Sequence, residues 1–156
     1  MLNVQISSRV LSEGYDISTP VGDFSAKKVI FSFTDKFLIS DPSGNQIARL
    51  GVKSFFSRVF YIVFSGGGFY QFDRDAKAKR TWTCEGEGRL LSLSERSKHR
   101  FFISDGSQDI AEGTKTWYAR DYAIKVANDS DLRLVVCIFI ALSVREYQQS
   151  SNMPIS

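Results

Sequence analysis

Apolar and polar residues alternate along most of the chain in short runs, and turn residues separate these runs. In residues 121–126, for example, Tyr122, Ile124 and Val126 share one face, while Asp, Ala and Lys take the other. A period of two residues is typical of half-buried β-strands. The pattern predicts twelve strands, at residues 2–7, 15–18, 24–32, 36–40, 46–53, 58–64, 69–74, 80–84, 89–93, 100–104, 109–116 and 120–127.

The breaks between these runs contain residues that favour tight turns. Asp-Pro-Ser-Gly occurs at 41–44, Ser-Gly-Gly-Gly at 65–68, Glu-Gly-Glu-Gly at 85–88 and Asp-Gly at 105–106. Asp, Pro and Gly each supply a backbone geometry or a side-chain acceptor that turns need. Short strands joined by short turns predict a mainly β protein, either a sandwich or a closed barrel.

One phrase occurs twice in this pattern. Residues 37–41 read FLISD and residues 101–105 read FFISD, and an Ile-Ala pair follows each of them, at 47–48 and 110–111. We interpret the repeat as two equivalent hairpins of a duplicated fold, in preference to a chance match between two turns. The aspartate of each phrase then opens a turn, and its role is structural.

The longest apolar run lies at residues 132–144 and reads LRLVVCIFIALSV. An Asp-Ser-Asp sequence precedes the run and Arg145 follows it, which suits the two ends of a helix. The β-branched residues in the run favour a strand, but the run is long for a strand. As a helix it would span about 20 Å, short of the roughly 30 Å hydrocarbon core of a bilayer. We therefore predict a buried hydrophobic helix over about residues 131–146, around which a pseudo-duplicated barrel closes.

Composition and length fit one globular domain. The chain has 156 residues, of which 43% are hydrophobic and 24% charged, and this length is enough to bury a core. We predict a single domain over residues 1–147 and a polar tail over residues 148–156. Cys84 and Cys137 lie in apolar runs without a CxxC spacing, so we expect reduced, buried thiols. The N-terminus lacks the apolar segment of a signal peptide, so we expect a cytoplasmic protein that is at most peripheral to a membrane.

The sequence contains no motif for catalysis or metal binding. His99 is the single histidine, so a catalytic triad or a histidine-rich metal site would lack partners. The Ser-Gly-Gly-Gly turn is not followed by the Gly-Lys-Ser/Thr sequence that a phosphate-binding loop requires. Glu85 and Glu87 are flanked by glycines, which favours a solvated turn over a catalytic carboxylate pair. We expect no enzymatic activity, no cofactor and no bound metal.

Positive charge is concentrated in the middle of the chain. Residues 74–100 contain eight basic and four acidic residues, a balance of +4, in a chain whose net charge is +3. If the clusters at 77–80 and 96–100 meet in space, they form a patch able to bind phosphate groups; if they do not, charged turns only keep strand edges soluble. Trp82 and Trp117 could flank such a patch, although a Trp in a strand more often packs in the core or at the rim. The candidate ligand-binding residues are Arg74, Lys77, Lys79, Arg80, Arg96, Lys98 and Arg100.

The order of these features resembles the tubby C-terminal-like superfamily. Residues 37–48 match the pattern F-x-I-S-D-x-x-G-x-x-I-A, residues 119–131 read ARDYAIKVANDSD, and the apolar run follows. Within the superfamily the chain is most similar to the LURP-one-related proteins and more distantly to the phospholipid scramblases. The resemblance extends over about residues 15–147. It implies a twelve-stranded antiparallel barrel closed around one hydrophobic C-terminal helix.

The same resemblance implies a function. Tubby-like barrels bind phosphoinositides, which implies an anionic lipid headgroup or a membrane surface as the partner of the basic residues. We expect a non-enzymatic binding or scaffold module that docks to phosphoinositide or acidic membrane surfaces. The alternatives are a scramblase-like protein, a small-ligand barrel and a nucleic-acid-binding barrel. Asn-Asp-Ser-Asp at 128–131 lacks the Gly and the distal Glu of a calcium-binding EF-hand, and the low net charge argues against nucleic acid.

Overall fold

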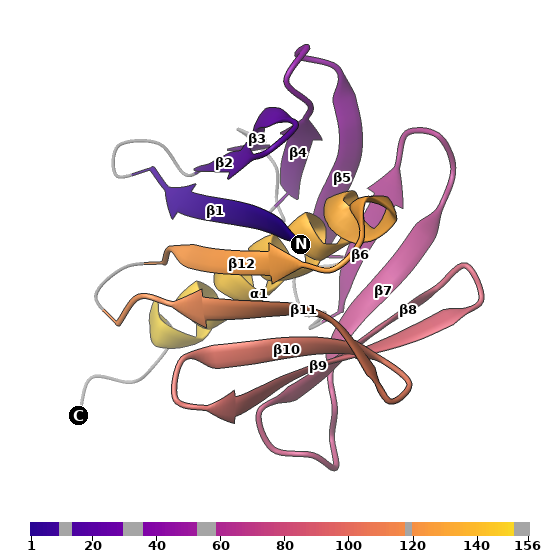
Figure 1. The fold of residues 1–156 in the computed structure, drawn as a ribbon, viewed down its shortest axis with the longest axis vertical. Coiled ribbons are helices and arrows are strands. Elements are labelled where there is room, and N and C mark those ends of the chain that lie inside the picture. The colour runs from indigo at the N-terminus through magenta and orange to yellow at the C-terminus, as the bar shows by residue number, and fades with distance from the viewer. Residues whose placement is uncertain (10–13, 30–35, 53–58, 118–119, 152–156) are drawn as a thin grey trace.

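The computed structural model describes residues 1–9, 14–29, 36–52, 59–117 and 120–151, and in residues 147–151 it describes the backbone alone. Over this part of the chain the alternating pattern becomes twelve strands of a closed barrel, as predicted (Figure 1). The strands are β1 (Leu2–Ser8), β2 (Gly14–Thr19), β3 (Gly22–Lys28), β4 (Lys36–Ser40), β5 (Gln46–Val52), β6 (Phe60–Phe64), β7 (Phe69–Arg74), β8 (Thr81–Gly86), β9 (Arg89–Ser97), β10 (Arg100–Asp105), β11 (Gln108–Lys115) and β12 (Tyr122–Val126).

Each strand pairs with its neighbours in the chain, and the first strand pairs with the last. The order around the barrel is β1-β12-β11-β10-β9-β8-β7-β6-β5-β4-β3-β2. β1 and β12 are antiparallel and close the ring, with Val4 opposite Ile124. Because the ring is closed, the described strands present no open sheet edge to another chain.

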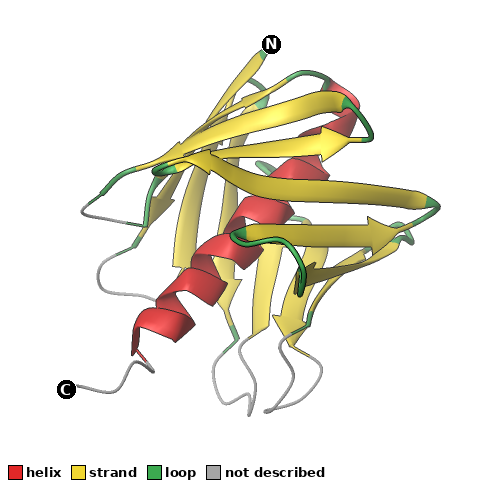
Figure 2. Ribbon diagram, turned by 90° about the horizontal axis from the view of Figure 1, so that it is seen from below, coloured by secondary structure: helices red, strands yellow, loops and turns green. Residues whose placement is uncertain are grey.

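The apolar run forms helix α1 (Leu132–Ser151), which a short 3-10 helix, η1 (Asp129–Asp131), introduces. α1 crosses the interior of the barrel from one end toward the other (Figure 2). Every residue from Leu134 to Val144 is buried, because strands surround the helix on all sides. This burial overrides the strand preference of the β-branched residues in the run.

The helix extends beyond its predicted end. α1 finishes at Ser151, so residues 148–151 of the predicted polar tail are helical, and residues 152–156 lie outside the described residues. Gln and Arg are good helix formers, so a helix that the core has already nucleated continues through them. Arg145, expected at the last turn, instead lies within α1, with its guanidinium carbon 5.5 Å from the centroid of the Phe60 ring. Among the described residues, no helix has the length and apolar character needed to cross a membrane.

Gly113 on β11 makes room for the helix. A Cβ atom at Gly113 would lie 2.6 Å from ring atoms of Phe139, a fully buried residue of α1. The Phe139 ring in turn packs against Tyr122 of β12, with the two ring centroids 5.3 Å apart. A side chain at position 113 would therefore push the helix away from the barrel wall.

The two FxISD phrases occupy equivalent hairpins, as the repeat predicts. The first phrase ends β4 and the second ends β10, and each hairpin has a register irregularity at the same point of the phrase, between Ile39 and Ser40 and between Ile103 and Ser104. In the first copy, Asp41 Oδ1 accepts hydrogen bonds from two backbone N–H groups of its own turn, at 3.0 and 2.9 Å. The aspartate thus stabilises the turn, which confirms its structural interpretation.

The connections between strands lie at two ends of the barrel that differ in charge. α1 begins at one end and finishes at the other, and successive connections alternate between the two ends (Figure 2). At the acidic end, where α1 begins, the described charges are Asp23, Asp41, Glu85, Glu87, Asp105, Asp109, Asp129 and Asp131 against Arg89, Lys125 and Arg133. At the basic end, where α1 finishes, they are Arg9, Lys27, Lys28, Lys36, Arg74, Lys77, Lys79, Arg80, Arg96, Lys98, Arg100, Lys115, Arg120 and Arg145 against Asp16, Asp73, Asp75, Glu95, Asp121 and Glu146.

Candidate functional site

The two predicted basic clusters lie side by side at the basic end. One occupies the connection between β7 and β8, residues 75–80, and the other includes the turn between β9 and β10, residues 98–99. β8 pairs with β9, and the backbone N of Glu95 donates a hydrogen bond to the carbonyl O of Arg80 at 3.1 Å. The fold therefore joins the clusters into one region, which the sequence alone left open.

The β7–β8 connection has a defined backbone. Asp75 Oδ1 accepts hydrogen bonds from the backbone N of Lys77 at 2.8 Å and of the next residue at 3.2 Å, and its own N donates to the carbonyl O of Thr81 at 2.8 Å. Arg80 closes the turn with a left-handed φ of 54°. On this backbone the side chains of Lys77 and Lys79 are exposed, so two ammonium groups project from a fixed support.

The β9–β10 turn presents the third lysine of the region. Lys98 is exposed, and His99 takes a left-handed φ of 65° to reverse the chain between Ser97 and Arg100, which pair with each other. The backbone N of Lys115 donates a hydrogen bond to the carbonyl O of His99 at 2.8 Å. The turn is thus attached to the end of β11, and Lys98 stands at a defined place on the rim.

Four of the seven predicted residues are exposed cations without an ion pair to any described residue. Arg74 lies opposite the buried Trp82 in the β7–β8 register, so its side chain leaves the sheet toward the mouth of the barrel. An exposed ammonium or guanidinium group without a carboxylate partner keeps its full charge for an anion from solution. The four residues are Arg74, Lys77, Lys79 and Lys98.

Arg80 instead closes the mouth of the barrel. Its Nη2 lies 2.5 Å from Glu95 Oε2 on β9 and 2.7 Å from Glu146 Oε1 on α1. Its guanidinium carbon lies 5.0 Å from the centroid of the Trp82 ring, which adds a cation–π contact. Arg80 therefore connects the helix to the barrel wall. Its charge is already paired with two carboxylates of the protein, so it is less available to an external anion.

Arg96 and Arg100 lie on the outer wall and are also paired. Both guanidinium groups lie over the ring of Phe102, at 4.3 and 5.5 Å from its centroid. Arg96 binds both carboxylate oxygens of Asp109, at 2.8 and 2.6 Å, and Arg100 lies 3.7 Å from Glu112. Hydrogen bonds from Arg96, and then from a serine hydroxyl, lower the pKa of Asp109 to about 2. These two arginines are less available to an external anion than the four exposed cations.

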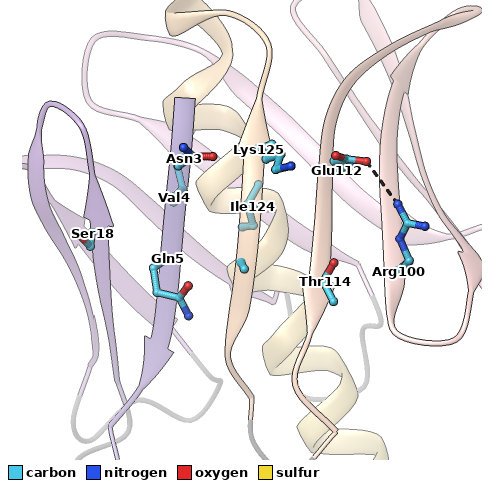
Figure 3. A pocket seen from close by; sticks show the side chains of 10 residues that line it. Asn3, Val4, Gln5, Ser18, Arg100, Glu112, Thr114, Ile124 and Lys125 are labelled. Carbon is cyan, nitrogen blue, oxygen red and sulfur yellow. Dashed lines mark ion pairs between the residues drawn. The ribbon is translucent and has the colours of Figure 1, made fainter. Parts of the chain in front are cut away.

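A hollow of about 590 Å³ opens on the outer wall beside Arg100 (Figure 3). Its centre is Ala123, whose neighbours across the strands are Gln5 and Thr114, and Arg100 follows Thr114 in the same row. The hollow exists because Ala123 is smaller than the side chains on either side of it. Its polar lining consists of Asn3, Gln5, Ser18, Arg100, Glu112, Thr114 and Lys125. This mixture of amides, hydroxyls and charges suits a polar molecule and shows no preference for an apolar one.

The two tryptophans have opposite environments, which the sequence did not separate. Trp82 is 1% exposed and packs in the core, whereas Trp117 is 81% exposed at the basic end. The neighbouring sequence distinguishes the two tryptophans. Trp82 lies between polar residues in a strand of alternating pattern, whereas Trp117 lies beyond the end of β11. Trp117 thus adds a large apolar group to the basic region.

The described part of the chain contains no cluster of three or more His, Cys, Asp or Glu side chains able to hold a metal ion. Cys84 and Cys137 are free and buried, as predicted, and burial raises the pKa of the Cys84 thiol to about 12. Glu87 accepts a hydrogen bond from the backbone N of Phe69 at 2.9 Å, so it supports a neighbouring turn in agreement with its structural interpretation.

No family model matches the chain, and neither a curated protein nor a solved structure matches it. The basis for a functional proposal is therefore the arrangement of charge at the basic end.

Proposed function

We propose that this protein is a non-enzymatic docking module that binds anionic membrane surfaces, including surfaces that carry phosphoinositides, through its basic end. The resemblance to tubby-like proteins supports this proposal, because a barrel around one hydrophobic helix is the architecture it implies. We propose membership of that superfamily on the same grounds. The single observation that carries the functional proposal is the group of exposed cations at one end of the closed barrel that form no ion pair with a described residue.

The electrostatics of this end favour a surface over a single small anion. Three of the exposed cations come from two connections and Arg74 ends β7, and an extended surface of negative charge can meet all four at once. Each Lys or Arg near an anionic leaflet contributes about 1 kcal/mol. Salt screens such contacts, with a Debye length of about 8 Å at physiological ionic strength. The proposal therefore requires binding that weakens as salt is added.

The test uses cosedimentation with phosphatidylcholine vesicles that lack or contain phosphatidylserine or a phosphoinositide. We expect binding to the anionic vesicles alone, and weaker binding at high salt. Reversing the three exposed lysines together, as Lys77→Glu, Lys79→Glu and Lys98→Glu, should weaken it by at least about a hundredfold, because three contributions of about 1 kcal/mol are lost. Arg80 is left unchanged, because its reversal would disturb the contact with α1.

The matched control reverses three other exposed cations: Arg49→Glu, Lys125→Glu and Arg133→Glu. These residues lie on the middle of β5, near the end of β12 and at the start of α1, and none is ion-paired with a described residue. The control has the same net charge as the first variant, so it should keep most of the vesicle binding if position decides. An equal loss in both triple variants, or no binding of the wild type at low salt, contradicts the proposal.

A further inference from the structure

Large apolar side chains are exposed at only five positions of the described chain, and four of these lie at the acidic end. Val21 is in the β2–β3 turn, and the others adjoin the starts of β1, β7 and β9. Trp117 is the fifth. It lies at the basic end, two residues beyond the end of β11, and 81% of its surface is exposed. The basic end thus combines its cations with one large aromatic side chain.

Two hydrogen bonds hold the backbone that precedes Trp117. The N of Lys115 donates a hydrogen bond to the carbonyl O of His99 at 2.8 Å, and the N of Thr116 donates to the carbonyl O of Asp121 at 3.0 Å. The first bond attaches this connection to the β9–β10 turn, and the second closes its base. Trp117 therefore projects from a supported position, which lowers the entropy that its insertion into another phase would cost.

The surroundings of Trp117 are basic. Lys98 is exposed on the turn to which the backbone of Lys115 is bonded, and Lys115 precedes Trp117 by two residues. Indole has an apolar body and one N–H donor, so Trp is enriched where the hydrocarbon of a bilayer meets its headgroups. An exposed Trp beside lysines therefore fits an anionic bilayer, which offers phosphate to the lysines and an interface to the indole.

We infer that Trp117 inserts its indole into the headgroup region of an anionic bilayer and anchors the barrel with the finishing end of α1 toward the membrane. The inference deepens the proposed function and rests on it, since the basic end must first bind the membrane. It adds an orientation and a non-electrostatic contribution. Binding should therefore keep a component that high salt does not remove.

The two tryptophans allow a direct test by fluorescence. Trp82 is 1% exposed in the core, so a lipid-dependent change in emission reports on Trp117, and the difference between wild type and Trp117→Phe isolates it. With phosphatidylserine-containing vesicles we expect a blue shift, protection from aqueous quenchers and quenching by lipids brominated near the headgroup. Trp117→Ala should weaken vesicle binding about tenfold, as the burial of one large side chain predicts, and Trp117→Phe should weaken it less.

The control is Val21→Ser, which removes an exposed apolar side chain from a turn at the acidic end, where Val21 is 58% exposed. It should change neither binding nor fluorescence. If the wild type binds anionic vesicles but Trp117 is not quenched by brominated lipid and Trp117→Ala binds normally, the anchor is wrong and the proposed function stands. If the wild type binds no anionic vesicle, both are wrong. Because Trp117 is exposed, its variants should unfold at the same urea concentration as the wild type, which separates lost binding from lost folding.

Discussion

At each end of the barrel, one arginine of the wall forms ion pairs that hold the central helix. The two ends differ in the sign of the charges that remain exposed there. At the acidic end, Arg89 on β9 binds Asp105 of β10 at 2.9 Å and Asp131, the residue before α1, at 2.8 Å. Asp131 is a nearly buried carboxylate at the start of a helix, where the helix dipole also favours a negative charge. One arginine thus ties the beginning of the helix to the wall.

At the basic end, Arg80 makes the equivalent connection to Glu95 of β9 and Glu146 of α1, at 2.5 and 2.7 Å. It differs from Arg89 in that it also stacks on the Trp82 ring at 5.0 Å. The side chains of Glu95 and Glu146 are 20% and 17% exposed. The strand carboxylate that binds Arg80 is therefore better shielded from solvent than Asp105, the strand carboxylate that binds Arg89, which is 44% exposed.

The leftover charges differ for a chemical reason. Turns leave backbone N–H groups without partners, and carboxylates accept hydrogen bonds from them, as Asp41 does within its turn and Glu87 does from Phe69. A lysine ammonium group has no acceptor and cannot satisfy such a donor. An excess of acids at one end therefore has a structural explanation, whereas exposed lysines such as Lys77 at the other end do not. This contrast is why the functional proposal concerns the basic end.

The largest effect should come from breaking the contact at the basic end. Arg80→Ala removes the cation that Glu95 and Glu146 share, and should lower the free energy of unfolding by about 2–3 kcal/mol. Urea denaturation followed by far-UV circular dichroism measures it. Arg80→Lys keeps the charge but loses the stacking of the guanidinium group on the Trp82 ring, so an intermediate loss is expected. A loss below about 0.5 kcal/mol for Arg80→Ala would show that this end does not depend on Arg80.

The equivalent substitution at the acidic end, Arg89→Ala, should destabilise the protein less than Arg80→Ala does. Arg89→Ala should lower the free energy of unfolding by about 1–2 kcal/mol, because the side chain of Asp105 is 44% exposed and is re-solvated when Arg89 is removed. The same urea experiment applies. In a double-mutant cycle with Asp131→Asn, the coupling energy should account for most of the loss, since Asp131 is the shielded partner. A larger loss for Arg89→Ala than for Arg80→Ala would reverse the ranking of the two ends.

The smallest effect concerns the paired charge of Asp109 and depends on pH. The pKa of Asp109 lies at about 2 in the folded protein, below the ordinary value of 3.8. The Arg96 contact therefore stabilises the protein above about pH 3.8, and the stabilisation fades as pH falls toward 2. Asp109→Asn should cost a few tenths of a kcal/mol at pH 7, because the pair is largely exposed. Wild type and variant should converge in urea denaturation near pH 2, and a gap that widens on acidification would contradict the assignment.

Most strands could be predicted from the sequence because their signal is local. The alternation around Ile124 or Ile39 depends on neighbours in the same strand, so all twelve strands fall close to their predicted positions. Strand ends were predicted less well. β9 continues to Ser97 instead of residue 93 because its pairing partner β10 begins at Arg100 and extends the ladder. Residues 30–32 of the third predicted strand, residue 53 of the fifth and residue 58 of the sixth lie outside the described residues.

The candidate site could be predicted only in part. Charge density along the chain selected seven candidate residues, and turn composition located the two connections that carry four of them. It could not show that Arg80 is neutralised by Glu146, or Arg96 by Asp109, because these pairs form between separate elements. Charge density also does not separate the two tryptophans. The sequence signal that does so is the place of each residue relative to a strand, which puts Trp82 within β8 and Trp117 beyond the end of β11.

The sequence by itself determined the strand pattern, the two equivalent hairpins and the presence of one hydrophobic segment, because each depends on residues within about one element of each other. The length of this segment also predicted a buried helix, and the tertiary structure decided how it is enclosed, since a closed ring of strands can bury a helix on every side. It also decided which charges remain for a partner. Charge pairing depends on the distances between side chains of separate elements. Closure of the barrel sets these distances, so the sequence pattern of one element cannot predict them.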